Sequence, residues 1–235
     1  MAKTALITGA SRGIGLETSR RLLANEDVQT IVVLARESDA FTESIRELET
    51  IAAPNNKRVV SRAIDVGDRA ALQALIPELS QEVGNIDILI NNAGYTNPVP
   101  LQQIDFADFE RTMAVNLYGP FTLIQDLLHL GNEFDLIVNI ASTAGITGRS
   151  GWLTYSASKA AVINMSQVLR EELAIYGTRV VSISPGRTAT ALRKVLAPDE
   201  DPSTIMQPQH VAQVIEMLAS SVGQYIDSEN LVVRQ

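Results

Sequence analysis

The chain has 235 residues, carries a net charge of −8 and contains no cysteine. The negative charge disfavours nucleic acid or an anionic membrane as a partner, and the lack of cysteine excludes disulfides and thiolate chemistry. No apolar run approaches the ~20 residues that a membrane-spanning helix needs, and glycine interrupts the apolar start of the chain too early for a signal peptide. We therefore expect a cytoplasmic protein without a nucleic-acid or membrane partner.

Short runs rich in β-branched residues alternate with longer amphipathic runs. Strands are predicted at residues 4–9, 30–35, 58–65, 86–94, 134–142, 178–186 and 230–235. Helices are predicted at residues 13–25, 37–52, 68–83, 106–130, 155–174 and 207–222. The strand runs are nearly continuous in apolar residues, which is typical of strands covered on both faces. The pattern predicts an α/β fold, in which right-handed crossovers connect a parallel sheet between two helical layers.

Neither a linker nor a break in composition divides the chain, so we expect a single domain over residues 1–235. Two polar, proline-containing segments, 94–103 and 186–208, interrupt the alternation after the fourth and sixth predicted strands. Ligands bind beyond the carboxyl ends of strands in open α/β sheets, and long irregular segments there are commonly functional loops. We expect a substrate loop at about residues 187–208.

The segment TGASRGIG, from Thr8 to Gly15, connects the first predicted strand to the first predicted helix. Its glycines permit a tight turn close to a ligand, and the helix N-terminus behind them favours an anion. The spacing is neither GxGxxG nor that of a P-loop, so a bare glycine turn is the alternative. Its position directly after the first strand favours dinucleotide binding. The residues predicted to bind are Gly9, Ser11, Arg12, Gly13, Ile14 and Gly15.

The end of the second strand indicates which dinucleotide is bound. An acid there holds the ribose hydroxyls of NAD, whereas an arginine accommodates the 2′-phosphate of NADP. Here the strand ends in VVLARES, with Arg36 before the first acid, Glu37. Arg12 in the glycine loop is a second candidate cation, because a guanidinium binds phosphate through bidentate charge-assisted bonds. We predict NADP(H) in preference to NAD, with two solvated surface arginines as the alternative.

Four motifs stand in order along the chain: TGASRGIG, NNAG at residues 91–94, a serine at the end of the fifth strand, and YSASK at residues 155–159. Together they resemble the short-chain dehydrogenase/reductase family, in its short single-domain branch, over nearly the whole chain. The resemblance implies a Rossmann-type, doubly wound sheet of seven parallel strands in the order 3-2-1-4-5-6-7. It also implies a nicotinamide dinucleotide cofactor and a small-molecule carbonyl or alcohol substrate.

The functional residues of the family can be carried over position by position. The catalytic set that the resemblance implies is Asn116, Ser142, Tyr155 and Lys159. Tyr155 and Lys159 also belong to the implied cofactor site. Its other members are Asp65 and Val66 at the adenine, Asn91, Ala93 and Gly94 beside the ribose, and Pro185, Gly186, Thr188 and Thr190 in the PGxxxT segment near the nicotinamide.

Carbonyl reduction gives a reason for a tyrosine and a lysine one helical turn apart. The cofactor supplies a hydride to carbon, and the protein supplies a proton to oxygen. A free tyrosine has a pKa of about 10, and the charges of Lys159 and of the oxidised nicotinamide would favour its phenolate. The Ser142 hydroxyl can donate to the substrate oxygen as charge develops on it. The resemblance implies that Asn116 anchors a water linking Lys159 to solvent.

Each catalytic candidate also has a structural interpretation. Tyr155 and Lys159 would share a helix face in any helix. Ser142 could cap a turn at the end of a strand, and Asn116 could be a buried amide with all its hydrogen bonds satisfied. The joint occurrence of the motifs favours the catalytic interpretation.

Other polar and aromatic residues are assigned structural roles. His129 and His210 belong to no motif and are predicted to be structural or surface residues. The chain has no cluster with metal-ligand spacing, so we expect no metal. Tyr95 and Trp152 flank the motifs and are interpreted as packing residues, with the pocket wall as the alternative. Charges of the substrate loop, such as Arg193, are expected to be solvated.

The leading hypothesis is an NADPH-dependent ketone or aldehyde reductase. A 3-oxoacyl-carrier-protein reductase and a pterin or diketone reductase of the sepiapterin-reductase type are the alternatives. A fourth hypothesis, an NADP-binding redox sensor without turnover, is disfavoured because Ser142, Tyr155 and Lys159 are all present.

We also expect a homo-oligomer, because the helices of Asn116 and Tyr155 are apolar enough to pair across a two-fold axis. Many family members end in a glycine-rich tail that lies near a tetramer interface. This chain instead ends in YIDSENLVVRQ, with Ser228 near the usual glycine position. The expectation is therefore a homodimer or homotetramer, with the dimer as the minimum.

Overall fold

The structure is a computed structural model that describes residues 2–226 and 229–235, so Ser228 lies outside the described residues. Seven parallel strands form one sheet in the order β3-β2-β1-β4-β5-β6-β7, which confirms the predicted fold class and strand order. The strands are β1 (Lys3–Thr8), β2 (Val28–Ala35), β3 (Arg58–Ala63), β4 (Ile88–Asn91), β5 (Leu136–Ile140), β6 (Arg179–Pro185) and β7 (Asn230–Val233).

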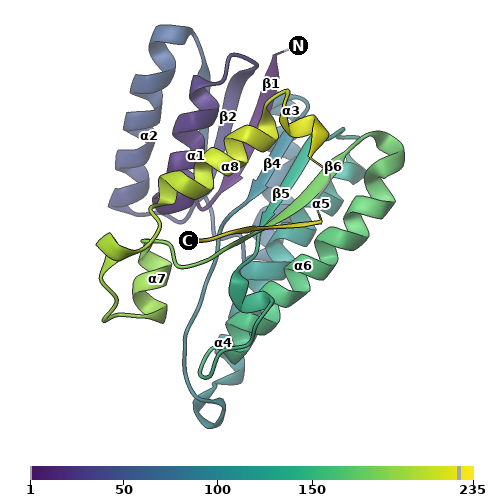
Figure 1. The fold of residues 1–235 in the computed structure, drawn as a ribbon. Helices are drawn as coiled ribbons and strands as arrows, with labels where there is room; N and C mark the ends of the chain where they lie inside the picture. The colour runs from purple at the N-terminus through teal and green to yellow at the C-terminus, as the bar shows by residue number, and fades with distance from the viewer. Residues whose placement is uncertain (1, 227–228) are drawn as a thin grey trace.

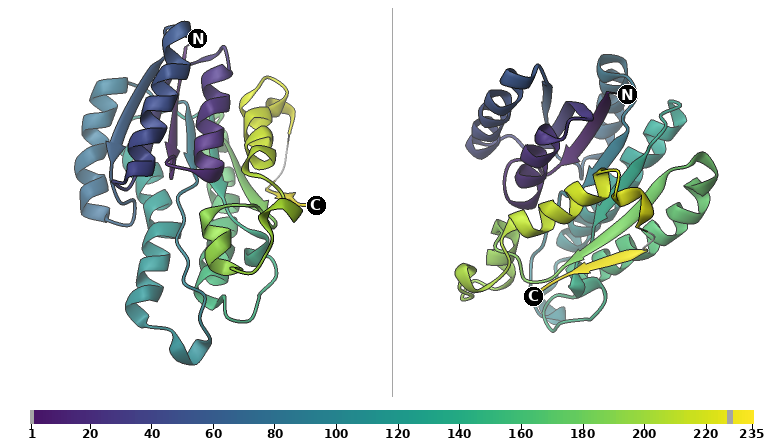
Figure 2. Two further views of the ribbon diagram at one scale, coloured as in Figure 1. Left: turned by 90° about the vertical axis from the view of Figure 1, so that its left-hand side faces the viewer. Right: turned by 45° about the horizontal axis from the view of Figure 1, so that its top comes forward.

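Helices cover both faces of this sheet. They are α1 (Gly13–Ala24), α2 (Asp39–Ala52), α3 (Arg69–Val83), α4 (Phe106–Met113), α5 (Gly119–His129), α6 (Leu153–Leu173), α7 (Ala191–Leu196) and α8 (Pro208–Ala219). Helices α1, α2 and α8 lie on one face, and α3, α5 and α6 lie on the other (Figures 1 and 2). In the part of the chain that the structure describes, no helix is long and apolar enough to cross a membrane.

Two hydrophobic cores explain why the strands are apolar on both faces. In β1, Ala5 and Ile7 pack under α1, α2 and α8, whereas Leu6 between them packs on the opposite side, against the core of α3 and α5. Successive side chains of a strand point to opposite faces, so a sheet with two helical layers needs apolar residues at consecutive positions.

The helix predicted at residues 106–130 is interrupted. Between α4 and α5 lies a π-helical turn, η3 (Ala114–Tyr118), in which the Gly119 N–H donates to the carbonyl of Ala114, five residues earlier. Pro120 has no N–H and cannot donate to the Asn116 carbonyl, four residues before it, as an α-helix would require. Such wide turns occur frequently at functional sites, and this one contains Asn116.

The strand order places a topological switch point between β1 and β4. The chain leaves β1 towards β2 on one side and leaves β4 towards β5 on the other, so the loops at the carboxyl ends diverge. In open α/β sheets, ligands bind in the crevice at such a point. The segment between β4 and α4, and the one that carries α7, extend from this edge of the sheet (Figure 1).

Candidate active site

A cleft of about 390 Å³ opens at the switch point. The predicted cofactor residues that line it are Gly9, Ser11, Arg12, Gly13, Ile14, Arg36, Asp65, Val66, Ala93, Gly94, Pro185, Gly186, Thr188 and Thr190. Ser142, Tyr155 and Lys159 also line it, so one cleft brings both predicted groups together. Gly15, Asn91 and Asn116 are buried and lie behind this lining.

The glycine loop is packed too tightly for side chains at two of its positions. Gly9 has a φ of 69°, and a Cβ there would lie 2.8 Å from the Cα of Ala93. A Cβ on Gly15 would lie 2.4 Å from the carbonyl oxygen of Gly9. No side chain caps the N-terminus of α1 behind this loop, so the first N–H groups of the helix have no side-chain acceptor, and such groups can donate to an anion.

A hydrogen-bond network joins the loop that follows β1 to the loop that follows β4. The Thr8 hydroxyl accepts from the backbone N–H groups of Asn92 and Ala93, each at 3.0 Å. The Asn92 amide donates to the carbonyl of Thr8 at 2.9 Å and to that of Gly9 at 3.2 Å. Asn91 points the other way and donates to Asn139 on β5 at 2.9 Å. Asn91 thus supports the sheet, while Asn92 lines the cleft.

Cations gather at the end of the cleft formed by β2 and β3. Arg12 and Arg36 are exposed and line it. Arg111 of α4 donates to Asp65 at 2.6 Å and lies over the Tyr95 ring, 5.4 Å from its centroid. Burial raises the pKa of Asp65, but the hydrogen bonds of Arg111 and Gly67 and the nearby arginine charges outweigh it and lower that pKa overall. Asp65 is therefore an ionised acceptor.

Tyr155 and Ser142 meet at the other end of the cleft. Tyr155, in the first turn of α6, is 6% exposed, and burial raises the pKa of its phenol. A hydrogen bond with the Ser142 hydroxyl and the charge of Arg193 oppose this rise in pKa. Ser142 follows β5 and also accepts from the Ala144 N–H at 3.1 Å, so its orientation is fixed. The phenol is therefore protonated at neutral pH and lies beside a second hydroxyl.

Lys159 is 3% exposed and lies one helical turn after Tyr155. Its ammonium lies 5.9 Å from the centroid of the Tyr155 ring and donates to the Ile140 carbonyl at 2.7 Å. Burial lowers the pKa of Lys159 to about 8. The lysine is consequently a cation at neutral pH that can lose its proton under mildly alkaline conditions.

The side-chain amide of Asn116 is fully engaged. Its oxygen accepts from the Tyr95 N–H at 2.7 Å, and its nitrogen donates to the Tyr95 carbonyl at 3.0 Å and to the Ser158 hydroxyl at 2.9 Å. A Cβ on Gly94 would lie 3.7 Å from the Asn116 oxygen and 3.9 Å from the Lys159 ammonium. Asn116 thus connects the loop after β4 to α6, close to the lysine.

Two aromatic residues that were predicted to pack also line the cleft. Trp152 and Tyr155 make an edge-to-face contact with their ring centroids 6.4 Å apart. Tyr95 lines the cleft and donates to Asp108 at 2.6 Å. His129 and His210 are exposed and outside the cleft. Over residues 2–226 and 229–235, no group of three or more His, Cys, Asp or Glu side chains is arranged to hold a metal.

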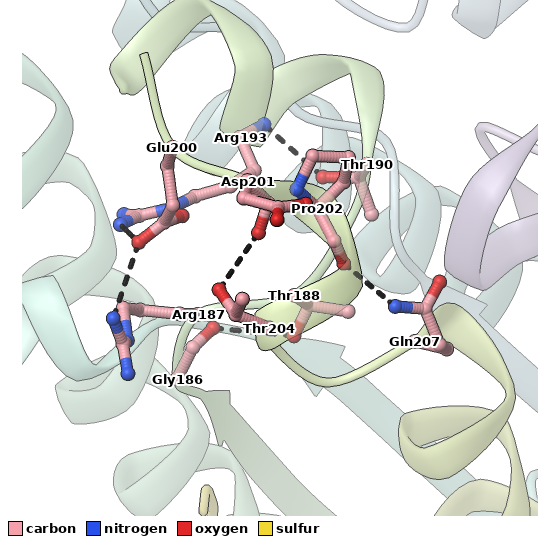
Figure 3. Close-up of polar contacts among 10 residues, drawn as sticks. All are labelled: Gly186, Arg187, Thr188, Thr190, Arg193, Glu200, Asp201, Pro202, Thr204 and Gln207. Carbon is pink, nitrogen blue, oxygen red and sulfur yellow. Dashed lines mark hydrogen bonds and ion pairs between the residues drawn. The ribbon is translucent and has the colours of Figure 1, made fainter. Parts of the chain in front are cut away.

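The substrate-loop segment is ordered by its own hydrogen bonds (Figure 3). Glu200 accepts from Arg193 at 2.5 and 2.7 Å and contacts Arg187 at 3.4 Å. Thr190 caps α7 by accepting from the Arg193 N–H at 3.1 Å. Gln207, at the C-terminal end of the segment, donates to the Pro202 carbonyl at 2.8 Å. These contacts hold α7 and Arg193 against the cleft.

Several lining residues were not among the predicted site residues. Asn92 stands directly after the last residue of β4, and a strand-end position was a usable signal for it. Arg111 and Arg149 belong to no motif, because their positions follow from helix and loop packing. Arg193 was predicted to be solvated, yet its side chain is only 16% exposed and paired with Glu200.

Comparisons with known proteins agree with this geometry. A family model described as short chain dehydrogenase matches residues 3–201. The 3-oxoacyl-[acyl-carrier-protein] reductase of Thermotoga maritima is 31% identical over 97% of this chain and 94% of that protein. The acetoacetyl-CoA reductase of an Acinetobacter species is 30% identical over 98% of this chain and 96% of its own length. The crystal structure of a blue fluorescent protein from a metagenomic library, in complex with NADPH, has a TM-score of 0.86 at 28% identity and covers 98% of this chain and 96% of its own. The chain therefore belongs to the short-chain dehydrogenase/reductase family of nicotinamide-dependent oxidoreductases, as its motifs predicted.

Proposed function

We propose that the protein interconverts a ketone or aldehyde and the corresponding alcohol, with NADP(H) as hydride carrier and Tyr155 as general acid and base. The observation that carries this proposal is the meeting of Tyr155 and Ser142 on one buried wall of the cleft, with Lys159 one turn behind them. The closely packed turn at Gly9 and Gly15, in front of the uncapped N-terminus of α1, fits a dinucleotide phosphate.

Because it is buried, Tyr155 carries the proton that carbonyl reduction needs. Because the pKa of the phenol is raised, Tyr155 is protonated and can donate to a carbonyl oxygen. Ser142 can donate a second hydrogen bond to the same oxygen and stabilise the charge that develops there. When bound, the nicotinamide supplies the hydride to the carbon or accepts it from the alcohol. The two hydroxyls orient the carbonyl for that transfer.

Lys159 then stabilises the phenolate that remains after proton donation. At neutral pH its ammonium is charged and lies under the Tyr155 ring, where a cation favours the ionised phenol. Asn116 is the proposed anchor of a water beside Lys159. Since its side-chain amide is engaged, the backbone carbonyl is the available atom, and Pro120 cannot provide the α-helical donor to it.

Arg12 and Arg36 are the proposed ligands of the 2′-phosphate of NADP. Both guanidinium groups are exposed at the β2 end of the cleft, and residue 36 is the first one after β2. An arginine at this position suits NADP, whereas an acid would suit NAD. The NADPH bound by the structurally similar blue fluorescent protein supports this preference.

A 3-oxoacyl thioester is the second candidate substrate. The relatives from Thermotoga maritima and Acinetobacter are named for reductions of this class. Leu192 and Leu196 of α7 line the cleft and offer apolar surface for an acyl chain. The residues proposed for proton and hydride transfer are the same for both substrate classes.

The test is a coupled measurement of cofactor binding and turnover. NADPH oxidation at 340 nm is followed with ketones, aldehydes, diketones, a pterin and acetoacetyl-CoA, and NADPH affinity is measured by calorimetry. Turnover of one or more carbonyls supports the proposal and ranks the substrate classes. Tight NADPH binding without turnover of any class would instead support a redox sensor, and absence of NADPH binding would overturn the cofactor assignment.

We further propose that the protein is a homodimer, paired through α5 and α6. Phe121 of α5, Tyr118 of the preceding π-helical turn and Val168 of α6 are large exposed apolar side chains. Helix α6 packs against α4 and η3, so these elements offer a common apolar surface. Burying such a surface against a second copy removes it from water.

A further inference from the structure

The cleft is rich in positive charge although the chain is acidic. The chain has 19 cationic and 27 acidic residues. Seven of the cations line the cleft, namely Lys159 and the arginines Arg12, Arg36, Arg111, Arg149, Arg187 and Arg193, against two acids, Glu37 and Asp65. A cleft lined by one sign of charge concentrates the field and attracts ligands of the opposite sign. The charge of the cleft therefore favours anionic ligands.

The proposed cofactor accounts for two of these seven cations. Arg12 and Arg36 serve the 2′-phosphate, and Arg111 is paired with Asp65. The other three arginines line the cleft from the loop before α6 and from the substrate loop, near Tyr155. That end receives the nicotinamide ring and the substrate, and the phosphates of a dinucleotide belong to the glycine loop. The positive charge around Tyr155 thus exceeds what the cofactor requires.

Two of these arginines make cation–π contacts with the ring of Trp152. The guanidinium carbons of Arg149 and Arg193 lie 5.5 and 5.6 Å from the centroid of its ring. The same ring makes the edge-to-face contact with Tyr155 at 6.4 Å. A guanidinium held on an aromatic face keeps its N–H groups free for an oxyanion, which it binds in a bidentate manner. Trp152 therefore holds two guanidinium groups near the proposed proton donor.

The two guanidinium groups differ in what they already bind. Arg193 is committed to Glu200 through two hydrogen bonds, at 2.5 and 2.7 Å. For Arg149, which is exposed, the described residues include no acidic partner. Arg149 is thus a cation at the substrate end of the cleft whose charge is not neutralised within the protein.

We infer that Arg149, held on Trp152, recognises an anionic group of the substrate, so that the carbonyl compounds preferred by this site carry a carboxylate or a phosphate. The inference rests on the proposed function, because it names the substrate class of that same cleft. A charge-assisted hydrogen bond contributes about 1.5–3 kcal/mol, which corresponds to a preference of tenfold or more over an uncharged analogue.

The first experiment measures binding independently of turnover. Trp152 is the one tryptophan of the chain, so its fluorescence reports on a ligand of Arg149. The protein is titrated with pentanoate, butyl phosphate and the neutral pentanamide, with and without NADP⁺. We expect saturable fluorescence changes with one or both anions, at dissociation constants at least tenfold below that of pentanamide. The better anion identifies the group, and added salt should weaken its binding.

Three variants assign this binding to Arg149. Arg149→Gln should raise the dissociation constant of the anion about tenfold and leave that of pentanamide unchanged, whereas Arg149→Lys keeps the charge and should retain part of the affinity. Arg46→Gln removes an exposed arginine of α2 outside the cleft and should have no effect. Equal affinity for anion and amide, or no difference between Arg149→Gln and Arg46→Gln, would overturn the inference.

The second experiment separates failure of this inference from failure of the proposed function. NADPH oxidation is compared for 5-oxohexanoate, its methyl ester and a ketone phosphate monoester. An anion preference in kcat/KM that is lost in Arg149→Gln supports both proposals. Reduction of the ester without an anion preference, and without selective anion binding, would overturn the inference alone. Anion binding that depends on Arg149, without reduction of any carbonyl, would support the anion site and contradict the proposed reduction.

Discussion

The ammonium of Lys159 donates a 2.7 Å hydrogen bond to the backbone carbonyl of Ile140, at the end of β5. This bond holds a buried cation between the sheet and the Tyr155 ring. A single neutral acceptor does not replace the hydration that the ammonium loses on burial, and the pKa of the lysine falls to about 8 in consequence. Burial of the charged Lys159 therefore lowers the stability of the fold at neutral pH.

Lys159→Met should stabilise the fold at pH 7. The folded-state pKa of about 8 lies below the ordinary lysine value of 10.5, so charging the buried lysine costs about 3 kcal/mol. Loss of the hydrogen bond to Ile140 offsets about 1 kcal/mol of that. We expect the free energy of unfolding in urea to rise by about 1–2 kcal/mol at fixed protein concentration.

The same variant has a defined pH dependence. The unfolded chain binds the lysine proton up to about pH 10.5, and the folded chain releases it near pH 8, so wild-type stability rises across this interval. The advantage of Lys159→Met should thus shrink between pH 8 and 10.5. A variant less stable than wild type at pH 7, or an advantage independent of pH, would contradict the lowered pKa.

Gly145→Ala should disturb the proposed site through the backbone. A Cβ on Gly145, after Ser142 in the turn that follows β5, would lie 2.6 Å from the carbonyl carbon of Lys159 and 2.7 Å from the N of Ala160. Backbone of α6 must then shift, which costs about 1–3 kcal/mol and moves Tyr155 relative to Ser142. Thermal unfolding and kcat are the measurements. Gly148→Ala is the control, because nothing lies within 4 Å of its added Cβ, and equal behaviour of the two variants would contradict the tight packing.

Arg36→Glu should change cofactor selectivity. Removing a guanidinium from the phosphate and placing an acid beside the ribose weakens NADPH and favours NADH. We expect the ratio of kcat/KM for NADPH over NADH to fall at least tenfold, in line with charge-assisted bonds of about 1.5–3 kcal/mol. Arg46→Glu makes the same charge change outside the cleft. A ratio near one in the wild type, or one that Arg36→Glu leaves unchanged, would refute the NADP assignment.

Phe121→Glu should separate the proposed homodimer. A charge in the centre of an apolar interface is costly, so light scattering at micromolar concentration should give twice the 25.5 kDa chain mass for the wild type and one chain mass for the variant. Tyr225→Glu replaces an exposed aromatic residue that is not on α5 or α6 and should remain dimeric. A monomeric wild type would contradict the proposal.

The strands were predictable from local patterns, whereas the sheet order and most of the expected site residues came from the resemblance of the motifs to a known family. Consecutive apolar residues such as Ala5, Leu6 and Ile7 predict a strand buried on both faces, and the two cores agree with this. The spacing of Tyr155 and Lys159 follows from one helical turn. The apolar runs and this spacing can be read from neighbouring residues alone, without knowledge of distant contacts.

Features that depend on tertiary packing were beyond the sequence. The π-helical turn at Asn116 requires two hydrogen-bond registers to meet in one helix, and the pattern of residues 106–130 is compatible with a plain α-helix. The placement of Arg149 and Arg193 on Trp152 brings together the loop before α6 and the substrate loop. The pKa of Tyr155 is raised because tertiary packing buries the phenol, whereas the charges that the sequence indicates would lower this pKa.

The most direct test of the proposed function is the rate of NADPH-dependent carbonyl reduction in Tyr155→Phe, measured beside NADPH binding. Phenylalanine keeps the ring next to Trp152 and removes only the hydroxyl, and loss of a general acid costs about 10²–10⁴-fold in rate. We predict a fall in kcat/KM of at least 100-fold with an NADPH dissociation constant within about threefold of wild type. A variant that keeps more than a tenth of the wild-type kcat/KM would contradict the assignment of Tyr155 as the proton donor.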